Sequence, residues 1–548
     1  MREKFSYLLP LAAGVTLALT FLWLLTDGVR RRWPTRLPAS VATAPTVRAT
    51  PAPLAASAER APDAKTLAKL KRLRQALADA TARPDEAVLT FADDEAYRAF
   101  LARAQQAGLT IRGRLDAFRT VRVGYDTFAA LANDLLDHAA DYGDLGANYF
   151  VQIPTAPPKE ERAAGPEVPL GDRLRAFLGV NTDPSNWGRG VTIAILDSGV
   201  QPDATLGQGR LRFLDLGLGT APGSGATDGH GTAVAGLAAG AATDAPGVAP
   251  AADILSIRIT GTDGRSDLFT LAQAIVAAVD AGARIVNVSL GAYGSSGVLT
   301  QAIDYANQRG VALVAAAGND QAARLTWPAA DARVISVGAV DALGQQVSFS
   351  NSGDQLKLTA PGYGVQAAWL DGQRVSFDGT SASAPIVAGA IAALMSQNPG
   401  MNAAQAAQAL QHYSSDGGAP GADPAYGAGV LNLGWAMNRN DPARVDTAIS
   451  SQYFDAATGQ MEIVVQNRSG RAVSGLALDV NADNATRQFT VPTLAPGAIY
   501  TARLPVDQNR LESSGSLVFR AQLTNPPGLV DQEPANNRRA SLLAAPKK

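Results

Sequence analysis

The chain has 548 residues, which at about 150 residues per domain predicts three or four folded units. Hydrophobic residues make up 46% and charged residues 18%, which excludes wholesale disorder. The 47 Lys+Arg and 49 Asp+Glu give a net charge of −2, so no global positive field attracts nucleic acid. Because there is no cysteine, disulfides, thiolate metal sites and cysteine nucleophiles are excluded.

An uncharged apolar run from Tyr7 to Leu25 lies within the first segment, residues 1–33. As a helix it would reach about 28 Å, close to the hydrocarbon thickness of a bilayer. We favour an uncleaved membrane anchor over a cleaved signal peptide, because no Ala-x-Ala site follows the run directly. The arginines after the run outnumber the basic residues before it, so the positive-inside rule would put the body in the cytoplasm. The orientation therefore stays open.

Residues 34–64 are rich in proline and alanine, which predicts a linker. Residues 65–84 predict an amphipathic helix, with Leu67, Leu70, Leu73 and Leu77 on one stripe. We interpret it as a solvated helix that leads into the next domain, with a coiled-coil seam as the alternative.

Residues 85–155 predict a small α+β domain with the order β-α-β-β-α-β. The expected elements are a strand at 87–91, a helix at 93–107, two strands within 109–123, a helix at 127–138 and a strand at 148–153. A proline-rich loop follows at 156–175, and we expect it to be exposed and open to proteolysis.

Residues 176–440 predict an α/β domain, a mainly parallel sheet with helices on both faces. The expected strands are 191–196, 254–259, 285–289, 311–316 and 334–337, and the expected helices are 232–241, 267–281, 299–308 and 382–397. Chemistry in such a domain lies in the loops at the carboxyl ends of the strands. Residues 441–548 alternate short apolar segments with Gly, Asn and Pro turns, which predicts an all-β sandwich.

Three loop motifs carry the residue types of acyl transfer. Asp197 ends a strand, His230 stands between two glycines at a helix start, and Ser381 stands at the start of another helix. A serine hydroxyl is a poor nucleophile until a base removes its proton, and the base needs a third group to fix its tautomer. We expect Pro385 to lie in the first helical turn, where a missing N–H costs nothing. Asn319 follows a buried strand and a glycine, where its carboxamide is able to donate to an oxyanion.

At these residues the chain resembles the subtilisin-like serine proteases, over about residues 180–435 and with the four motifs in the family's order. The resemblance implies a serine endopeptidase in which Ser381 is the nucleophile, His230 the general base and acid, Asp197 the orienting carboxylate and Asn319 the oxyanion donor. It also implies two backbone walls that pair with an extended peptide: Ser289, Leu290 and Gly291 form one, and Ala316, Ala317 and Gly318 the other.

The chain departs from the family where many relatives carry a calcium loop. Residues 241–246 hold one carboxylate, Asp244, whereas calcium takes six to eight oxygens. We expect no required cofactor, and calcium elsewhere stays possible. No buried acid is evident that would select Lys or Arg in the substrate, so we expect an apolar or small side chain there.

The flanking segments are similar to other modules. Residues 85–155 resemble subtilase propeptides, which implies an intramolecular inhibitor removed by self-cleavage. Residues 441–548 resemble cell-adhesion-related bacterial β-sandwiches. The expected partners are protein or peptide substrates, the chain's own prodomain and a membrane through residues 7–25, with the catalytic domain outside the cytoplasm and no nucleic acid. The alternative is a catalytically silent peptide-binding or adhesion protein. Acid peptidases that use Glu and Asp are a further relative, which the intact His-Gly-Thr motif disfavours.

Overall fold

The computed structural model describes residues 63–155, 157, 167–202, 205–206, 209–482 and 485–545. The apolar run at 7–25 and nearly all of the linker at 34–64 lie outside these residues, so the predicted anchor stays a prediction. Within the described ranges, no helix combines the length and apolarity that crossing a bilayer requires.

A seven-stranded parallel sheet forms the centre of the region at 176–440, with strand order β12-β11-β10-β9-β5-β7-β6. The strands are β5 Thr192–Asp197, β6 Leu211–Leu214, β7 Asp253–Arg258, β9 Ile285–Val288, β10 Ala312–Ala316, β11 Ile335–Val340 and β12 Leu358–Pro361. Their aliphatic residues are buried on both faces, as expected for parallel strands covered by crossover helices.

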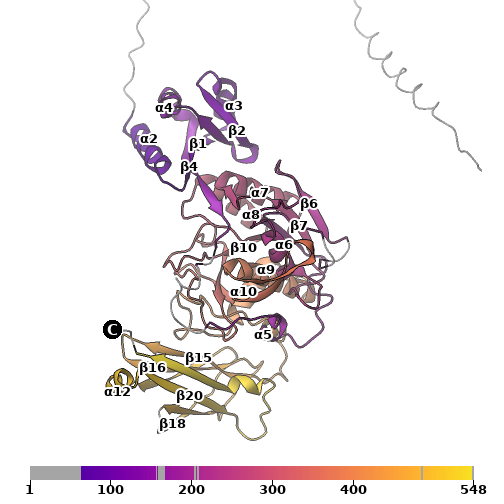
Figure 1. The fold of residues 1–548 in the computed structure, drawn as a ribbon, viewed down its shortest axis with the longest axis vertical. Coiled ribbons are helices and arrows are strands. Elements are labelled where there is room, and N and C mark those ends of the chain that lie inside the picture. Colours follow the sequence, from indigo (N-terminus) through magenta and orange to yellow (C-terminus); the bar gives the residue numbers. More distant parts are fainter. Residues whose placement is uncertain are drawn as a thin grey trace, which may run out of the picture. The chain divides into compact units, whose positions relative to one another are not determined.

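Side chains of β5 alternate between two cores. Ile193 and Ile195 pack with α6 (His230–Ala239) and α9 (Thr380–Gln397), whereas Ala194 and Leu196 pack with α7 (Leu268–Asp280) and α8 (Gly297–Gln308). The two-residue period of a strand produces this alternation. Figure 1 shows α7 and α8 on one side of the sheet and α9 on the other. The prediction of an α/β domain with helices on both faces is confirmed.

The five strands and four helices that the sequence predicted here are present, with ends shifted by at most three residues. The sequence pattern did not predict β6 and β12, because Arg212 interrupts the apolar run of the first, and Thr359 and Pro361 interrupt that of the second. It also missed α5 Leu174–Phe177, α10 Ala403–His412, α11 Leu433–Met437 and the hairpin of β13 Val365–Ala368 with β14 Arg374–Phe377.

The N-terminal region folds as an antiparallel sheet with the order β2-β3-β1-β4-β8. Its elements are α2 Ala64–Leu77, β1 Ala82–Phe91, α3 Asp94–Arg103, β2 Leu109–Leu115, β3 Thr120–Tyr125, α4 Phe128–Asp137 and β4 Tyr142–Gln152. The predicted β-α-β-β-α-β order is present. Most of α2 is exposed, including Leu67 at 51%, whereas Leu73 is buried in the core of this domain, with Leu70 and Leu77 packed against that core.

The last strand of that sheet, β8 (Arg265–Asp267), belongs to the region at 176–440 that contains the parallel sheet. It pairs antiparallel with Phe150–Gln152 at the end of β4, so one sheet joins the two regions.

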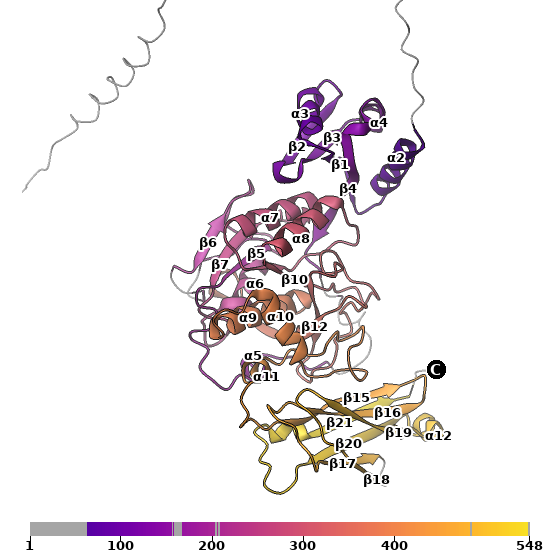
Figure 2. The same ribbon diagram turned by 180° about the vertical axis from the view of Figure 1, so that it is seen from behind.

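The C-terminal region consists of two antiparallel sheets with strand orders β15-β16-β19 and β18-β17-β20-β21 (Figure 2). The strands are β15 Thr447–Asp455, β16 Gln460–Asn467, β17 Ala477–Ala482, β18 Ala485–Thr490, β19 Ile499–Pro505, β20 Ser516–Thr524 and β21 Arg538–Ala544, and the region also contains α12 Gln508–Ser514 and a 3-10 turn at Pro534–Asn537. The inner faces of the two sheets share one apolar core, which includes Ile463, Leu478 and Phe519.

Candidate active site

Asp197 and His230 form a buried pair at the carboxyl end of the central sheet. Asp197 is the last residue of β5, and His230 is the first residue of α6. The imidazole Nδ1 lies 2.8 Å from Oδ1 and 3.0 Å from Oδ2 of Asp197, whose Oδ1 also accepts the Ser198 N–H at 2.7 Å. Since Nδ1 donates to the carboxylate, Nε2 is the ring nitrogen that remains able to accept a proton.

The glycines on either side of His230 are required by close contacts. A Cβ on Gly229 would overlap the indole of Trp369, and one on Gly231 would overlap the carbonyl oxygen of Gly199. Phe377 packs edge-on against the imidazole with ring centroids 5.2 Å apart. The ring is therefore held by packing as well as by the carboxylate.

Ser381 is the second residue of α9, after Gly379 with φ of +126° and Thr380. Pro385 lies in the second turn of the helix, not in the first as the sequence analysis expected. At that position a backbone N–H would donate to the carbonyl of Ser381. The carbonyl instead accepts a 3.2 Å hydrogen bond from Oγ of Ser289, which compensates for the missing donor.

The hydroxyl of Ser381 donates to the carbonyl oxygen of Ser289 at 3.2 Å. Nε2 of His230 is buried and has no hydrogen-bond partner among the described residues. Ser289 directly follows β9, whose Val288 pairs with Leu196 of β5, so Ser381 lies at the same edge of the sheet as Asp197, with its hydroxyl turned toward Ser289. Hydrogen bonds between a nucleophile and its base often tighten only when substrate binds.

Asn319 follows β10 by way of Ala317 and Gly318, whose φ of +111° is accessible mainly to glycine. Oδ1 of Asn319 accepts two hydrogen bonds from Thr380, from its N–H at 2.9 Å and from its Oγ1 at 2.8 Å. The amide group is thereby oriented, and Nδ2 donates to the carbonyl oxygen of Pro154 at 2.9 Å. A carboxamide donor next to the serine is the geometry that stabilises an oxyanion.

The chain that leaves β4 runs through this site between two backbone walls. Gln152 exchanges both backbone hydrogen bonds with Gly291, at 3.1 and 3.0 Å, and the Ile153 N–H donates to the carbonyl of Gly264 at 3.2 Å. Gly291 therefore pairs with the chain's own segment, and Leu290 is buried in the core. Pairing of residues 289–291 with a substrate stays a prediction.

The second predicted wall, residues 316–318, does not pair with this segment. Backbone groups of Ala317 bond to Val337 and Thr326, and the Gly318 N–H donates to Thr380 Oγ1. The opposite wall is instead formed by residues 264–267, including β8. Sequence reasoning missed β8 because a three-residue strand of Arg, Ser and Asp has no apolar pattern.

Asp244, the single carboxylate of the loop at 241–246, forms an ion pair with Arg374 at 3.0 Å. Within the part of the chain that the structure describes, no cluster of three or more His, Cys, Asp or Glu is arranged to hold a metal ion. The calcium question raised by the sequence is not tested by this pair.

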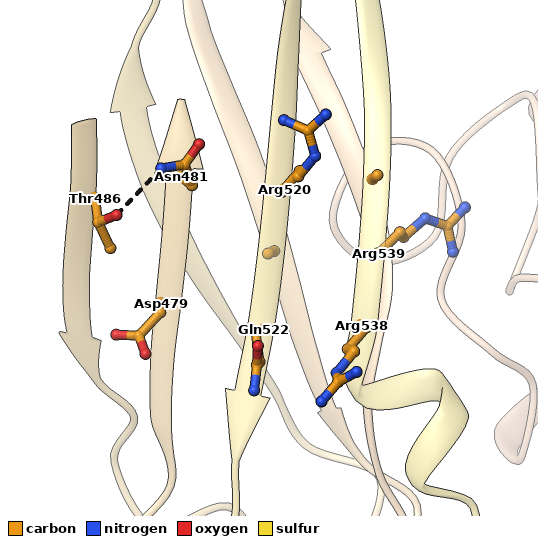
Figure 3. A pocket seen from close by; sticks show the side chains of 9 residues that line it. Asp479, Asn481, Thr486, Arg520, Gln522, Arg538 and Arg539 are labelled. Atoms are coloured by element: carbon orange, nitrogen blue, oxygen red, sulfur yellow. Dashed lines mark hydrogen bonds between the residues drawn. The ribbon is translucent and has the colours of Figure 1, made fainter. Parts of the chain in front are cut away.

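A separate hollow of about 560 Å³ lies over the sheet β18-β17-β20-β21. Figure 3 shows the polar side chains that line it, among them Asp479, Arg520 and Arg538. It contains no histidine and no activated serine.

A buried carboxylate that orients an imidazole, beside a serine at a helix start and a carboxamide donor, defines a serine hydrolase. Comparison with known proteins agrees. The model of the subtilase family matches residues 188–429. Subtilisin BL from Lederbergia lenta is 35% identical over 249 residues, which cover 45% of this chain and 90% of that protein.

A thermostable alkaline protease from Halalkalibacterium halodurans is 34% identical over 254 residues, covering 46% of this chain and 68% of that protein. Among solved structures, fervidolysin from Fervidobacterium pennivorans, a keratinolytic enzyme related to subtilisin, matches with a TM-score of 0.54 and 21% identity. That match covers 85% of this chain and 77% of fervidolysin and shows similarity of fold. The chain belongs to the subtilase family, and it is a subtilisin-like serine endopeptidase.

Proposed function

We propose that this protein hydrolyses peptide bonds with Ser381 as nucleophile, His230 as general base and acid, Asp197 as orienting carboxylate and Asn319 as oxyanion donor. The observation that carries the assignment is the buried pair of His230 Nδ1 with both oxygens of Asp197, at 2.8 and 3.0 Å. This pair leaves Nε2 as the base on the side of the ring away from the carboxylate.

The reaction follows from these positions. Ser381 Oγ attacks the substrate carbonyl while its proton moves to Nε2 of His230. The carbonyl oxygen, on which negative charge develops, accepts a hydrogen bond from Nδ2 of Asn319. Thr380 maintains the orientation of this amide. His230 then gives the proton to the leaving amine, and water hydrolyses the acyl-enzyme by the same route in reverse.

Labelling with a fluorophosphonate tests the assignment, because only an activated serine reacts with the probe. Purified protein should be labelled and should cleave a peptide substrate, and the Ser381→Ala variant should do neither. Ser383→Ala is the matched control, since Ser383 lies on the same helix but donates to the carbonyls of Ala360 and Pro361. Labelling of the Ser381→Ala variant would contradict the proposal. Absence of labelling in the wild type would support the alternative, a catalytically silent peptide-binding or adhesion protein.

We further propose that residues 63–154 act as an intramolecular inhibitor that self-cleavage removes. The support is the course of the chain: Gln152 is paired with Gly291 on one side, and residues 150–152 pair with β8 on the other. Val151 is fully buried and Ile153 is 8% exposed, so both side chains fill the cleft that a substrate would need.

Contacts at the start of α7 add to this interface. Asp267, the N-cap residue of α7, accepts a hydrogen bond from Arg122 Nη1 at 2.8 Å. Oδ1 of Asn148 accepts the N–H of Phe269 at 3.1 Å, and Nδ2 of Asn148 donates to the buried Glu86 at 2.9 Å. The N-terminal domain thus satisfies a backbone donor that a helix start leaves free.

The remaining assignments extend the same proposal. The apolar run at 7–25 would tether the protein to a membrane, with the catalytic region outside the cytoplasm. Its substrates there would be protein or peptide chains. Protease protection of the tagged full-length chain in intact cells tests this orientation: a C-terminal tag accessible to external protease supports it, and a protected tag contradicts it.

A further inference from the structure

The hydrogen bonds around residues 152–154 place one particular peptide bond at the catalytic serine. The carbonyl oxygen of Pro154 accepts from Nδ2 of Asn319 at 2.9 Å. Two residues earlier, Gln152 exchanges both backbone bonds with Gly291. This segment therefore lies in the cleft as a substrate does, with the Pro154 carbonyl at the oxyanion donor.

The antiparallel register then defines the partner of residue 154. Residues directly opposite each other exchange two hydrogen bonds at every second position, so the pair that follows Gln152 and Gly291 is Pro154 and Ser289. Any other residue at 154 would offer its N–H to the carbonyl of Ser289. Proline has no N–H to offer.

The carbonyl oxygen of Ser289, which receives no N–H from Pro154, accepts a hydrogen bond from the proposed nucleophile instead. The Ser289 oxygen accepts the hydroxyl of Ser381 at 3.2 Å, while Nε2 of His230 has no partner among the described residues. A backbone N–H at position 154 would compete for that oxygen and would release the hydroxyl toward His230. The proline therefore favours the serine orientation in which the base does not receive the proton.

We propose that Pro154–Thr155 is the bond that the protein hydrolyses in its own precursor, and that the proline slows this cleavage. The proposal rests on the proposed function of Ser381. After rotation of its side chain, Oγ of Ser381 bonds to the Pro154 carbonyl carbon and its proton passes to His230. The C–N bond to Thr155 breaks as His230 protonates the Thr155 nitrogen. Water then releases a fragment ending in the Pro154 carboxylate and a mature chain beginning with the Thr155 amine.

The Pro154–Thr155 bond directly precedes the loop at 156–175, which the sequence predicted to be open to proteolysis. The hydrogen bonds around residues 152–154, rather than exposure, select this bond. The masses of the two products identify the bond that is cleaved. Full-length wild type is purified and followed by intact mass spectrometry, with Ser381→Ala as the uncut reference. A released fragment ending at Pro154 and a rate independent of protein concentration support the proposal.

Pro154→Ala restores the backbone donor, and we expect self-cleavage about tenfold faster than in the wild type, the change that one additional backbone hydrogen bond supports. Pro157→Ala is the matched control, because it makes the same chemical change three residues later and adds no donor opposite Ser289. The Pro154→Ala change is also made in the Ser381→Ala background, where an unchanged melting temperature shows that the precursor still folds.

Each result separates the processing site from the enzyme assignment. A protein that fluorophosphonate labels but whose released fragment ends elsewhere overturns the Pro154–Thr155 site and leaves the proposed function intact. Cleavage at this bond at equal rates in the wild type and in Pro154→Ala overturns the slowing by proline. A wild type that neither reacts with the probe nor cleaves itself contradicts the proposed function, and with it the processing site.

Discussion

Thr380 donates two hydrogen bonds to Oδ1 of Asn319, from its backbone N–H at 2.9 Å and from Oγ1 at 2.8 Å. The residue directly before the proposed nucleophile therefore orients the proposed oxyanion donor. The two groups that act on the same carbonyl are thus connected through one residue at the start of α9.

We expect Asn319→Ala to lower kcat by about 10² to 10³ with little change in KM, a magnitude taken from subtilisin rather than derived from this chain. Thr380→Val retains the backbone donor and removes Oγ1, which donates to Asn319 and also accepts the Gly318 N–H, so its kcat should fall by about tenfold. Steady-state hydrolysis of a peptide substrate measures both variants. A Thr380→Val variant more impaired than Asn319→Ala would show that Thr380 acts on more than the carboxamide.

Replacing the nucleophile should abolish turnover. Ser381→Ala should lose on the order of 10⁶ in kcat, again the magnitude known for subtilisin. The variant should also remain at the full precursor mass, because self-cleavage uses the same serine. Casein hydrolysis at the wild-type rate would exclude Ser381 as the nucleophile.

Asp197→Asn keeps the size of the side chain and its acceptor for the Ser198 N–H, but an amide no longer holds the donor tautomer of His230. We expect kcat to fall by about 10⁴ and the melting temperature to change little. Peptide hydrolysis and thermal unfolding of the same preparation measure the two effects. A loss of activity that is matched by loss of folding would assign Asp197 a structural role only.

The ion pair of Arg122 with Asp267 should strengthen the inhibitory contact, because Asp267 is only 5% exposed and the arginine 21%. In precursor that is purified before processing, Arg122→Ala should raise the activity on a small peptide about tenfold. Arg114→Ala is the control, since Arg114 pairs with Asp116 inside its own domain. Equal activity of the two variants would show that the pair with Asp267 contributes nothing to inhibition.

Stability should depend on Asp416, a buried carboxyl in the loop that contacts β16. Burial, reinforced by the nearby Asp423, raises the pKa of Asp416 to about 7. The folded chain therefore holds this proton more tightly than the unfolded chain, in which the pKa is about 3.8. The resulting stabilisation is complete below about pH 4 and is lost as the pH rises through 7.

Asp416→Asn should remove this dependence while the amide oxygen still accepts the Gly421 N–H. We expect the melting temperature of the wild type to fall more between pH 5 and pH 8 than that of the variant, both measured in the Ser381→Ala background to prevent autolysis. Asp455→Asn is the control, because hydrogen bonds lower the pKa of that exposed carboxyl and it stays charged across this range. Parallel curves for wild type and Asp416→Asn would refute the assignment.

The motifs of the candidate site were predictable because each depends on local chemistry. A strand that ends in Asp197, glycines around His230 and a helix that starts next to Ser381 are visible as residue types in the sequence. The order of these motifs also indicated the family. The short strands β6, β8 and β12 were not predictable, since charged or polar residues or a proline interrupt the apolar pattern of each.

Tertiary structure decided the relationships between distant residues. Pro154 and Asn319 are 165 residues apart, and only the paired strands bring the carbonyl oxygen of Pro154 to the side-chain amide of Asn319. Likewise, the Ser289 hydroxyl replaces the hydrogen bond that Pro385 removes from α9. Sequence determined which groups are present and in which local conformation, whereas long-range packing and register decided which donor meets which acceptor, because those pairings depend on how the whole sheet closes.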